Sequence, residues 1–524
     1  MSRRRRLDSV VRRIDATRLR IDNPQGVPVT LYANSEIPVD AEAIDQLLDF
    51  VSLQTTLDTI AAQERAGRIA PFWGNGGDVG GRLASVVVTP DFHRGSGIPI
   101  GTVADARGFV IPQAVGKDVC CGMRLLITDL TRDELAPLLD RLSAPLRASF
   151  FEGRRDLPMS PRQREALLRD GLRGLLATCG DNSRTGLWRL YDRREQESDL
   201  DRVHFGGSLP ARGLFTFEDY IRGSGAVDGR DSHLGSVGGG NHFVEIQAVE
   251  DVLDGGTAHA WGVRTGAIAI MAHSGSVGLG HSVGSTFADR ARALFPRELQ
   301  HPEHGFYALP VAGPHAATAA AYLDAMRNAA NFAFGNRLML GLMALAALSE
   351  VAGRRIGARL VYDAPHNLVW EPGDGREGYL HRKGACPAGG PEPDTDGPFR
   401  YTGHPVIIPG SMGSSSYLLA GSGHAEALAS ACHGAGRALA RGKARQVNAE
   451  TYERALETLR VVTPIDPGAP SVRGRHDILE QYHARLKEEA PYAYKPIAPV
   501  IETVAAAGIA RPIARLWPLI TIKG

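Results

Sequence analysis

Five candidate metal ligands lie in four separate segments of this chain, and the fold has to bring these segments together. Asp118 stands three residues before Cys121, and Gly122 follows at once. Because glycine adopts tight turns without steric cost, the carboxylate and the thiol can point at one ion. Three further motifs each carry a histidine beside glycine or polar residues: Gly-Gly-Gly-Asn-His242-Phe, His273-Ser-Gly-Ser and Asp-Ala-Pro-His366-Asn. Together they form a ligand set suited to a borderline divalent ion such as Mn, Zn or Co.

The cysteine pair in the first motif allows two interpretations. One thiolate can bridge two ions, which would create the two-metal clamp used in phosphoryl and nucleotidyl transfer. The residues also allow a plainer interpretation, in which the histidines are structural and Cys121 is a small buried side chain. Adjacent side chains in an extended segment point in opposite directions. We therefore expect Cys121, and not Cys120, to share an ion with Asp118.

Composition limits the class of protein. A chain of 524 residues with 43% apolar and 22% charged residues is typical of a globular protein with a large core. The net charge of +1 provides no overall basic field, so a polyanionic partner would need a local patch. Five cysteines, an odd and sparse set, favour a reducing compartment. The basic residues 3–6 precede no signal-peptide core, and the apolar run 338–348 is shorter than the roughly 20 residues that span a bilayer. We expect a cytoplasmic protein with no membrane partner.

Residue periodicity predicts short strands and long helices without strict alternation, which indicates an α+β fold. Residues 1–20 are expected to form a basic arm, either mobile or a short amphipathic helix, and 180–235 an insertion or lid. We predict an N-terminal basic arm and helical segment in 1–66, followed by one large domain, 67–524, with mixed β-sheets and surrounding helices. The predicted helices are 40–66, 132–151, 160–177, 282–295, 316–351, 424–440, 449–461 and 476–489. The predicted strands are 83–88, 266–272, 359–362 and 516–522.

Two later stretches suggest a nucleotide. Residues 409–416, Pro-Gly-Ser-Met-Gly-Ser-Ser-Ser, offer hydroxyls and free amides for a phosphate or base cradle, although a flexible loop would have the same composition. The motif Cys-His433-Gly-Ala-Gly-Arg437 places an imidazole that can attack phosphorus near a guanidinium that can bind phosphate. A histidine on a helix surface is an equally good interpretation of His433. Lys523 and Gly524 would ordinarily be a frayed end.

In order along the chain, these and neighbouring motifs resemble the RtcB family of RNA ligases, which join RNA 3′-phosphate or 2′,3′-cyclic phosphate ends to 5′-hydroxyl ends. The motifs are Pro-Asp-x-His, Asp-x-x-Cys-Gly-Met, Gly-Gly-Asn-His-Phe, His-Ser-Gly-Ser, Pro-His-Asn, His-Arg-Lys-Gly-Ala, Gly-Ser-Met-Gly, His-Gly-Ala-Gly-Arg and a terminal Lys-Gly. The resemblance implies a distinctive α+β fold, GTP as cofactor and two Mn(II) ions. It implies RNA as the partner and leaves room for an archease-type activator protein.

The resemblance also assigns roles to residues. His433 would be guanylylated, would pass the guanylyl group to the RNA 3′-phosphate, and the 5′-hydroxyl would then release GMP; Arg437 belongs to the same catalytic motif. The metal ligands would be Asp118, Cys121 (bridging), His242, His273 and His366. The guanylate-contacting positions would be Asn241, Phe243, Glu245, Ser411, Ser416, Ala435, Gly436, Tyr494 and Lys523.

Three departures from the family pattern concern the substrate more than the nucleotide chemistry. Val277 stands where an arginine is usual, Cys120 where glycine or asparagine is common, and Cys386-Pro387 follows the Lys383 motif. Arg437 and Lys383 are candidates to supply the missing cation. The alternatives are an enzyme that guanylylates another nucleic-acid 3′-phosphate end, such as DNA, a metal-dependent hydrolase, and a non-catalytic RNA-binding protein.

Overall fold

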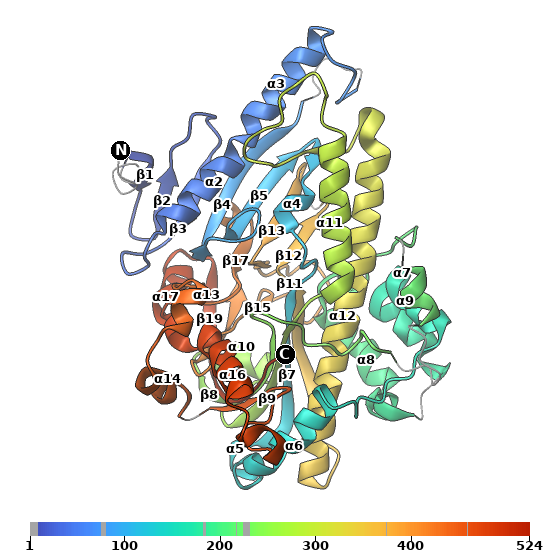
Figure 1. Cartoon of the computed structure of the whole chain (residues 1–524), viewed down its shortest axis with the longest axis vertical. Coiled ribbons are helices and arrows are strands. Elements are labelled where there is room, and N and C mark those ends of the chain that lie inside the picture. The colour runs from blue at the N-terminus through green and yellow to red at the C-terminus, as the bar shows by residue number, and fades with distance from the viewer. Residues whose placement is uncertain are drawn as a thin grey trace.

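Two large mixed β-sheets occupy the centre of the molecule, and helices cover them on both flanks (Figure 1). The structure is a computed structural model, and its α+β architecture agrees with the predicted fold class. It describes residues 9–74, 80–181, 185–215, 217–223, 231–373, 375–457 and 459–524.

The larger sheet runs in the order β11-β7-β9-β8-β19-β16-β15, with every neighbouring pair antiparallel, and β18 adds to β19 in parallel. Its central strands are nearly continuous apolar runs, because both faces are covered. The predicted strands 266–272, 359–362 and 516–522 are confirmed here. The strands are β7 Gly122–Thr131, β8 Phe243–Val252, β9 Ala267–Ser274, β11 Ala358–Pro365, β15 Pro405–Ile408, β16 Ser416–Gly421, β18 Arg460–Val462 and β19 Ala510–Ile522.

The second sheet has the order β1-β2-β3-β4-β5-β13-β12, and the predicted strand 83–88 is part of its β4. Two small sheets pair β6 with β10 and β14 with β17. The strands are β1 Val11–Arg13, β2 Arg18–Ile21, β3 Val29–Tyr32, β4 Arg82–His93, β5 Ile100–Arg107, β6 Phe109–Val110, β10 Leu309–Pro310, β12 Asn367–Trp370, β13 Tyr379–Lys383, β14 Ala385–Pro387 and β17 Ser430–Cys432.

The expectation of a mobile or helical arm in 1–20 is wrong for the part that the structure describes. Val11–Arg13 and Arg18–Ile21 form an antiparallel hairpin. β2 also pairs with β3 in antiparallel orientation, and β3 pairs with β4 in parallel orientation. Leu19 and Ile21 are buried while Arg20 between them is exposed, which is the alternation of a half-buried strand. The basic residues 3–6 lie outside the described residues.

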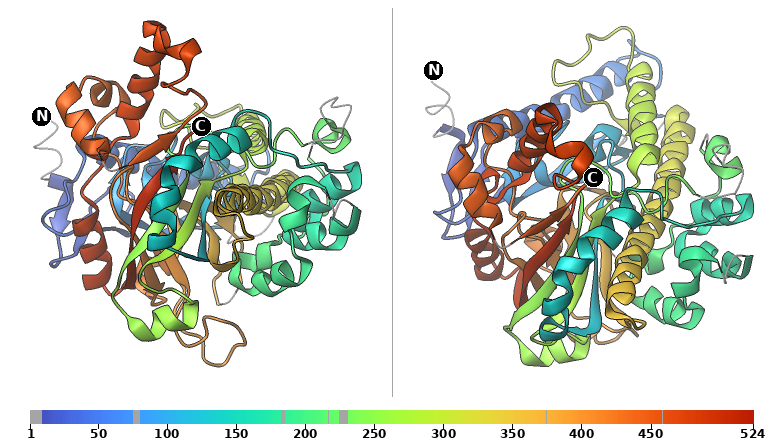
Figure 2. Two further views of the ribbon diagram at one scale, coloured as in Figure 1. Left: turned by 90° about the horizontal axis from the view of Figure 1, so that it is seen from below. Right: turned by 60° about the horizontal axis from the view of Figure 1, so that its bottom comes forward.

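A single long helix, α12 Ala316–Ala352, crosses the molecule beside α11 (Figures 1 and 2). Its length and apolar composition would suffice to cross a membrane, but 83% of its most apolar window is buried inside the protein. A helix that is apolar on all sides and covered on all sides belongs to a core. The predicted helix 316–351 is confirmed as this core helix.

Shorter helices complete the two flanks. The α-helices are α2 Ala41–Val51, α3 Leu53–Arg65, α4 Pro112–Val115, α5 Arg132–Leu135, α6 Leu139–Phe150, α7 Pro161–Thr178, α8 Arg193–Asp199, α9 Glu218–Arg222, α10 Gly255–Trp261, α11 Val277–Ala293, α13 Arg441–Arg445, α14 Ala449–Leu456, α15 Pro470–Arg473, α16 His476–Glu489 and α17 Ile497–Ala506. The 3-10 helices are η1 Ala136–Leu138, η2 Cys179–Asp181, η3 Gly186–Leu190, η4 Leu200–Arg202, η5 His204–Gly207, η6 Gly313–His315, η7 Ala425–Ala427 and η8 Pro491–Ala493.

Local signals set several helix ends. Ser160 and Gln163 form a reciprocal capping box around Pro161, which starts α7 as the sequence predicts. Asp40 caps α2 by accepting a hydrogen bond from the Glu42 amide at 2.9 Å. The predicted helix 40–66 is present as two helices, α2 and α3, which are divided at Ser52.

The predicted helix 424–440 is wrong. This segment contains the short η7, then β17, and then an irregular loop that carries His433. Arg382 holds the entry to β17, because its Nε donates to Ser430 Oγ at 2.9 Å. Gly436 has φ 77°, a conformation that ends regular structure. His433 is therefore a buried loop residue and not a histidine on a helix surface.

The described part of 180–235 consists of short helices and irregular loops that pack against α7 and α12. Asn331 of α12 both donates to the carbonyl of Leu209 and accepts from its amide, each at 2.8 Å. Asn328 accepts from the Phe215 amide at 3.2 Å. This packing holds the segment on the flank of α12, as Figure 1 shows for α8 and α9. That the segment is an insertion or a lid stays a prediction.

Backbone strain occurs near the histidine motifs. Cys120, Val277, Leu428 and Ala429 have φ between 46° and 57°, where only glycine is free of steric cost. Val277 is the most unusual of them, since β-branched side chains are least tolerated there. It is the first residue of α11 and is half-buried.

Replacing Val277 by glycine should therefore stabilise the protein. We expect Val277→Gly to raise the free energy of unfolding by about 1 kcal/mol, because a left-handed residue with a Cβ costs roughly 1–2 kcal/mol. Ser282→Gly, exposed in the interior of the same helix, is the matched control and should lower it by several tenths of a kcal/mol. Urea unfolding of the two variants measures both values. Destabilisation by both variants would show that position 277 carries no strain.

Candidate active site and metal centre

The five predicted metal ligands meet at the junction of the two sheets. Asp118 and Cys121 lie between α4 and β7, and His273 lies near the end of β9. His242 immediately precedes β8, and His366 lies between β11 in one sheet and β12 in the other. The register places the ends of β7, β8 and β9 together, since Met123 and Phe243 both pair with His273. Sheet pairing thus gathers ligands that are up to 248 positions apart in the chain.

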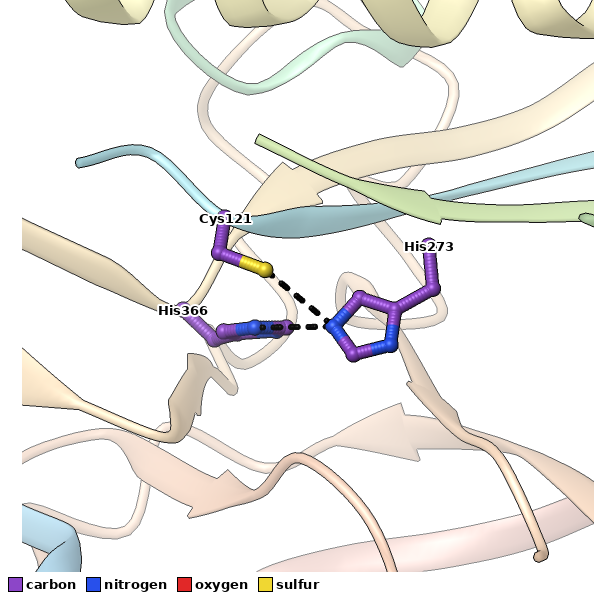
Figure 3. A group of neighbouring side chains, drawn as sticks. All are labelled: Cys121, His273 and His366. Atoms are coloured by element: carbon purple, nitrogen blue, oxygen red, sulfur yellow. Dashed lines mark hydrogen bonds between the residues drawn. The ribbon is translucent and has the colours of Figure 1, made fainter. Parts of the chain in front are cut away.

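The ligand atoms form two groups that share Cys121. Its Sγ lies 3.2 Å from Nε2 of His242 and 3.2 Å from Nε2 of His273. His242 Nε2 is 2.9 Å from Asp118 Oδ2. His273 Nε2 is 3.3 Å from His366 Nε2, and Figure 3 shows this contact together with the one between His273 and Cys121. The groups are Asp118, Cys121, His242 and Cys121, His273, His366. A thiol common to two groups matches the bridging role that the family resemblance implies.

The contact between two imidazole nitrogens shows that this donor set fits a cation. Burial lowers the pKa of His273 and of His366 well below the ordinary value, so both rings are neutral. Two ring nitrogens that face each other at 3.3 Å cannot both offer lone pairs without a shared proton or ion. Burial also raises the pKa of the Cys121 thiol, with the Asp118 carboxylate adding to the effect. A bound metal would reverse this shift, because a coordinated thiol loses its proton.

Glycines beside the ligands are explained by close packing. A Cβ on Gly275 would lie 2.4 Å from Asp118 Oδ1, and a Cβ on Gly238 would lie 2.5 Å from His242 Nδ1. These two positions cannot carry a side chain while the ligands keep their places. The glycine-rich motifs are thus part of the site.

Cys120 lies outside the ligand groups, as expected, but for a different reason. Its Sγ is 4.0 Å from Arg337 Nη2, on the side of α12, while Cys121 Sγ faces the histidines. The segment is not extended, since Cys120 has φ 57°. A left-handed residue turns the chain, and this is a position where glycine or asparagine would be unstrained.

His433 lies next to the metal ligands and has a partner that the sequence analysis missed. Its ring centre is 4.7 Å from that of His366, and its Nδ1–H donates to Asp91 Oδ2 at 2.6 Å. Burial alone would raise the pKa of Asp91, but the His433 ring and its hydrogen bond hold it below its ordinary value. The carboxylate fixes the tautomer, so Nε2 carries the free lone pair. Asp91 lies in the Pro-Asp-x-His motif, and this motif was the one sequence signal that could have pointed to its carboxylate as a functional group.

A cavity of about 990 Å³ opens over these residues. This volume is suitable for a nucleotide. Val277 is not among its described lining residues, and neither is any described residue of 180–235. Of the predicted nucleotide-contacting and catalytic residues, the cavity wall contains Asn241, Phe243, Glu245, Ser411, His433, Ala435, Gly436, Arg437, Tyr494 and Lys523.

Ser416 is not among the described lining residues and instead supports the cavity wall. Its Oγ accepts from Gln247 Nε2 at 3.0 Å and from the Gly410 amide at 3.1 Å. Gln247 also donates to Glu245 Oε2 at 2.6 Å. Ser416 therefore acts on the cavity through Gln247 and the 409–416 loop, rather than by facing it.

Glu245 and Lys523 form a polar end of the cavity. Thr521 Oγ1 donates to Glu245 Oε1 at 2.6 Å, and burial raises the pKa of this carboxyl to about 7. Lys523 Nζ donates to the carbonyls of Gly240 at 2.5 Å and His242 at 3.1 Å. Lys523 is thus not part of a frayed end: it is buried directly after β19 and is tied to the loop that carries His242.

Arg437 and Tyr494 form a second wall with a residue that no sequence motif indicated. Arg437 Nη2 donates to Glu489 Oε1 at 2.7 Å, and its guanidinium lies 4.9 Å from the centre of the Tyr494 ring. Tyr494 also donates to Glu489. Lys523 Nζ is 3.7 Å from the same carboxylate. Glu489 is the last residue of the predicted helix 476–489, whose polar composition is typical of a surface helix. No local sequence pattern therefore indicated that Glu489 lines the cavity.

Lys383 is the second cation of the cavity that could meet a phosphate. It is the last residue of β13, lines the cavity, and burial lowers the pKa of its ammonium to about 8. It donates to the Ser96 carbonyl. Arg437 is held by Glu489, so of the two candidates to replace the missing arginine at position 277, Lys383 is the one without a described ion pair.

Comparisons with known proteins agree with this geometry. The family model described as tRNA-splicing ligase RtcB matches residues 78–524. A tRNA-splicing ligase RtcB of Thermococcus kodakarensis is 33% identical, covering 98% of this chain and 99% of its own length. The tRNA-splicing ligase RtcB of Aeropyrum pernix is 32% identical over 84% of this chain and 88% of its own. The RNA-splicing ligase RtcB of Mycobacterium tuberculosis is 33% identical over 83% and 96%. The chain belongs to the RtcB family of ligases.

Proposed function

We propose that this protein is a GTP- and Mn(II)-dependent ligase that joins RNA 3′-phosphate or 2′,3′-cyclic phosphate ends to 5′-hydroxyl ends through a guanylyl-histidine. The observation that carries the proposal is His433, a buried imidazole oriented by Asp91, in a cavity that is also lined by members of both candidate metal-ligand groups, Asp118, Cys121, His273 and His366. Family membership supports the same reaction. Five free, buried cysteines support a reducing compartment such as the cytoplasm.

The first step is nucleotidyl transfer to His433. Nε2 uses its lone pair to attack the α-phosphorus of GTP, an N–P bond forms, and the bond to pyrophosphate breaks. The Nδ1–H stays on the ring and donates to Asp91 Oδ2, so the carboxylate balances the positive charge that develops on the ring. Asp91 is thus a positioning residue for the nucleophile.

The donor set fits two divalent ions that share one thiolate. Asp118, Cys121 and His242 would hold one ion, and Cys121, His273 and His366 the other. Mixed carboxylate, imidazole and thiolate ligands suit a first-row divalent ion, and Mn(II) is the one that the family resemblance implies. When bound, the metals supply neutralisation of charge on the phosphoryl oxygens.

The cavity walls offer groups that match guanosine. The Glu245 carboxylate accepts hydrogen bonds, as the N1–H and amino group of guanine require, and Lys523 donates, as its carbonyl requires. Tyr494 provides an aromatic face for the base. Arg437 and Lys383 supply cations for phosphates.

Two further transfers complete the reaction. A 2′,3′-cyclic end is first opened by water, which breaks the bond from phosphorus to the 2′-oxygen and leaves a 3′-phosphate and a 2′-hydroxyl. An oxygen of the RNA 3′-phosphate then attacks the phosphorus held on His433, the N–P bond breaks, and the guanylyl group moves to the RNA. The 5′-hydroxyl then attacks the activated 3′-phosphorus, a phosphodiester forms, and GMP leaves. Activation converts a poor leaving group into a good one, which is the purpose of the covalent step.

A metal-dependent hydrolase would use the same metals but would have no use for a nucleophile held by Asp91. We expect His433→Ala to abolish covalent attachment of α-labelled GMP while leaving metal content unchanged, because His433 belongs to neither ligand group. Asp91→Asn should slow labelling about a hundredfold or more, through loss of the oriented tautomer. Denaturing gels of protein incubated with GTP and Mn(II) measure both.

The exposed His259→Ala is the control and should label normally. Full labelling of His433→Ala would overturn the nucleophile. Absence of label on the wild-type protein would favour the hydrolase. Matched RNA and DNA ends, each with a 3′-phosphate and a 5′-hydroxyl, then separate an RNA ligase from an enzyme that acts on DNA.

The two adjacent cysteines offer a matched test of the metal centre. Cys121→Ser should lose bound manganese and guanylylation together, because a hydroxyl is a far poorer bridging ligand than a thiolate. Cys120→Ser should keep both, since its Sγ faces Arg337 and not the histidines. Elemental analysis of dialysed protein gives the manganese content. A Cys120→Ser protein stripped of metal would contradict the assignment of Cys121 as the shared ligand.

Burial of Glu245 predicts a pH dependence of stability. Its pKa rises from an ordinary value near 4.5 to about 7, so the folded protein holds a proton that the unfolded chain has released. The free energy of unfolding that this group contributes is therefore present below pH 4.5 and is lost as pH rises through about 7. Glu245→Gln cannot ionise and should lose less stability than the wild type between pH 5 and about pH 8.

Urea unfolding at the two pH values tests this expectation. Glu36→Gln, at an exposed position, serves as the control and should follow the wild type. A parallel loss of stability in Glu245→Gln and the wild type would show that Glu245 is ionised throughout this range.

A further inference from the structure

One fully buried guanidinium lies directly behind the metal ligands. Arg337 belongs to α12, and both it and its partner Asp363 have side chains with 0% exposure. Burial alone would lower the pKa of Arg337, but Asp363 and the neighbouring groups raise it above its ordinary value, so the side chain is charged. A buried charge of this kind needs every donor satisfied.

The acceptors of Arg337 all lie next to metal ligands. Nη1 donates to the carbonyl of Cys120 at 2.7 Å and to the carbonyl of Ser274 at 3.0 Å. Nε donates to Asp363 Oδ1 at 2.8 Å. Cys120 immediately precedes Cys121, Ser274 immediately follows His273, and Asp363 lies three residues before His366 on the same strand and turn. One side chain thus connects three of the four ligand-bearing segments.

The hydrogen bond from Arg337 holds a strained part of the backbone, the peptide at Cys120. Cys120 has φ 57°, a left-handed conformation that costs energy for a residue with a Cβ. Its amide donates to the Asn367 carbonyl at 2.7 Å, while its carbonyl accepts from Arg337. Both ends of the strained peptide are therefore fixed from outside, and the fixed turn points Cys121 Sγ at the histidines.

We propose that Arg337 is a positioning residue that sets the separation of Cys121, His273 and His366, and thereby the affinity and coordination of the metal centre. The inference rests on the metal role proposed above. Groups behind the ligands commonly change metal affinity by about ten- to a hundredfold when they are removed. A guanidinium suits this function because its planar donors are fixed relative to one another, unlike the single rotating ammonium of lysine.

The chain contains a matched control. Arg124 of β7 is also buried, and its Nη1 lies 3.2 Å from the other oxygen of Asp363. Arg124 has no described hydrogen bond to the carbonyls of Cys120 or Ser274. Arg337→Met and Arg124→Met each remove one buried cation from the same carboxylate. Both should lower the melting temperature, but only Arg337→Met frees the ligand segments.

Cobalt(II) is the probe, because its thiolate-to-metal charge-transfer band and its visible bands report ligand geometry without any need for activity. We expect the full-length Arg337→Met protein to bind cobalt at least tenfold more weakly than the wild type, with a changed charge-transfer band. Arg124→Met should stay within about twofold of the wild type and keep the wild-type spectrum. Arg337→Lys, which keeps the charge and part of the hydrogen bonding, should recover part of the affinity.

The outcomes separate this inference from the metal proposal. Wild-type protein that shows no thiolate-to-cobalt band overturns both. A wild-type band together with equal affinity loss in the two methionine variants, or none in Arg337→Met, overturns only the role of Arg337. Should Arg337→Met fail to fold, the same comparison between Arg337→Lys and Arg124→Lys decides, and equal spectra for these two overturn the inference.

Discussion

The packing of a buried thiol and three buried imidazoles against one half-buried carboxylate is the constraint on which the rest of this structure depends. Such groups are costly to remove from water, and His273 and His366 face each other through ring nitrogens at 3.3 Å. The cost is tolerable only if a cation is bound or the surrounding backbone holds the groups in place. The junction between two sheets provides that hold, because the ends of β7, β8 and β9 are fixed by their register and β11 passes directly into β12.

The long helix α12 completes the hold from one side. Its apolar residues form the core, while a few buried polar side chains on the same helix bind backbone that has no regular partner. Asn331 and Asn328 secure the 180–235 segment, and Asn336 accepts from the amides of Gly235 and Ser236 at 2.8 and 3.0 Å. Removing a polar side chain from water costs free energy, and the hydrogen bonds that each of these side chains makes to several backbone groups offset that cost. The helix thus supports irregular loops that sheets alone could not position.

The sequence could indicate the five candidate metal ligands because four of them stand close to glycine and His366 stands between proline and asparagine. These residue types mark turns and places where the backbone approaches closely. It could not predict the surroundings of His433, where small residues and alanines favoured a helix that tertiary pairing with β14 overrides. The partner Asp91 is 342 positions away, so only the fold reveals its hydrogen bond. Glu489 had no signal at all, since an acid at the end of a polar helix is ordinarily a surface residue. The surroundings of His433, Asp91 and Glu489 are set by contacts between distant parts of the chain, which a local sequence pattern does not show.

Charge distribution explains how a chain with a net charge of +1 can act on a polyanion. Lys383, Arg437 and Lys523 line the wall of one cavity. A low-dielectric wall strengthens the interaction of each of these charges with an anion. Burial lowers the pKa of Lys383 and of Lys523, because removing an ammonium group from water disfavours its charged form. A phosphate in the cavity would give Lys383, which has no described ion pair, an anionic partner. These cations lie in the same cavity wall as His433, where they can contact a phosphate that is bound next to its ring.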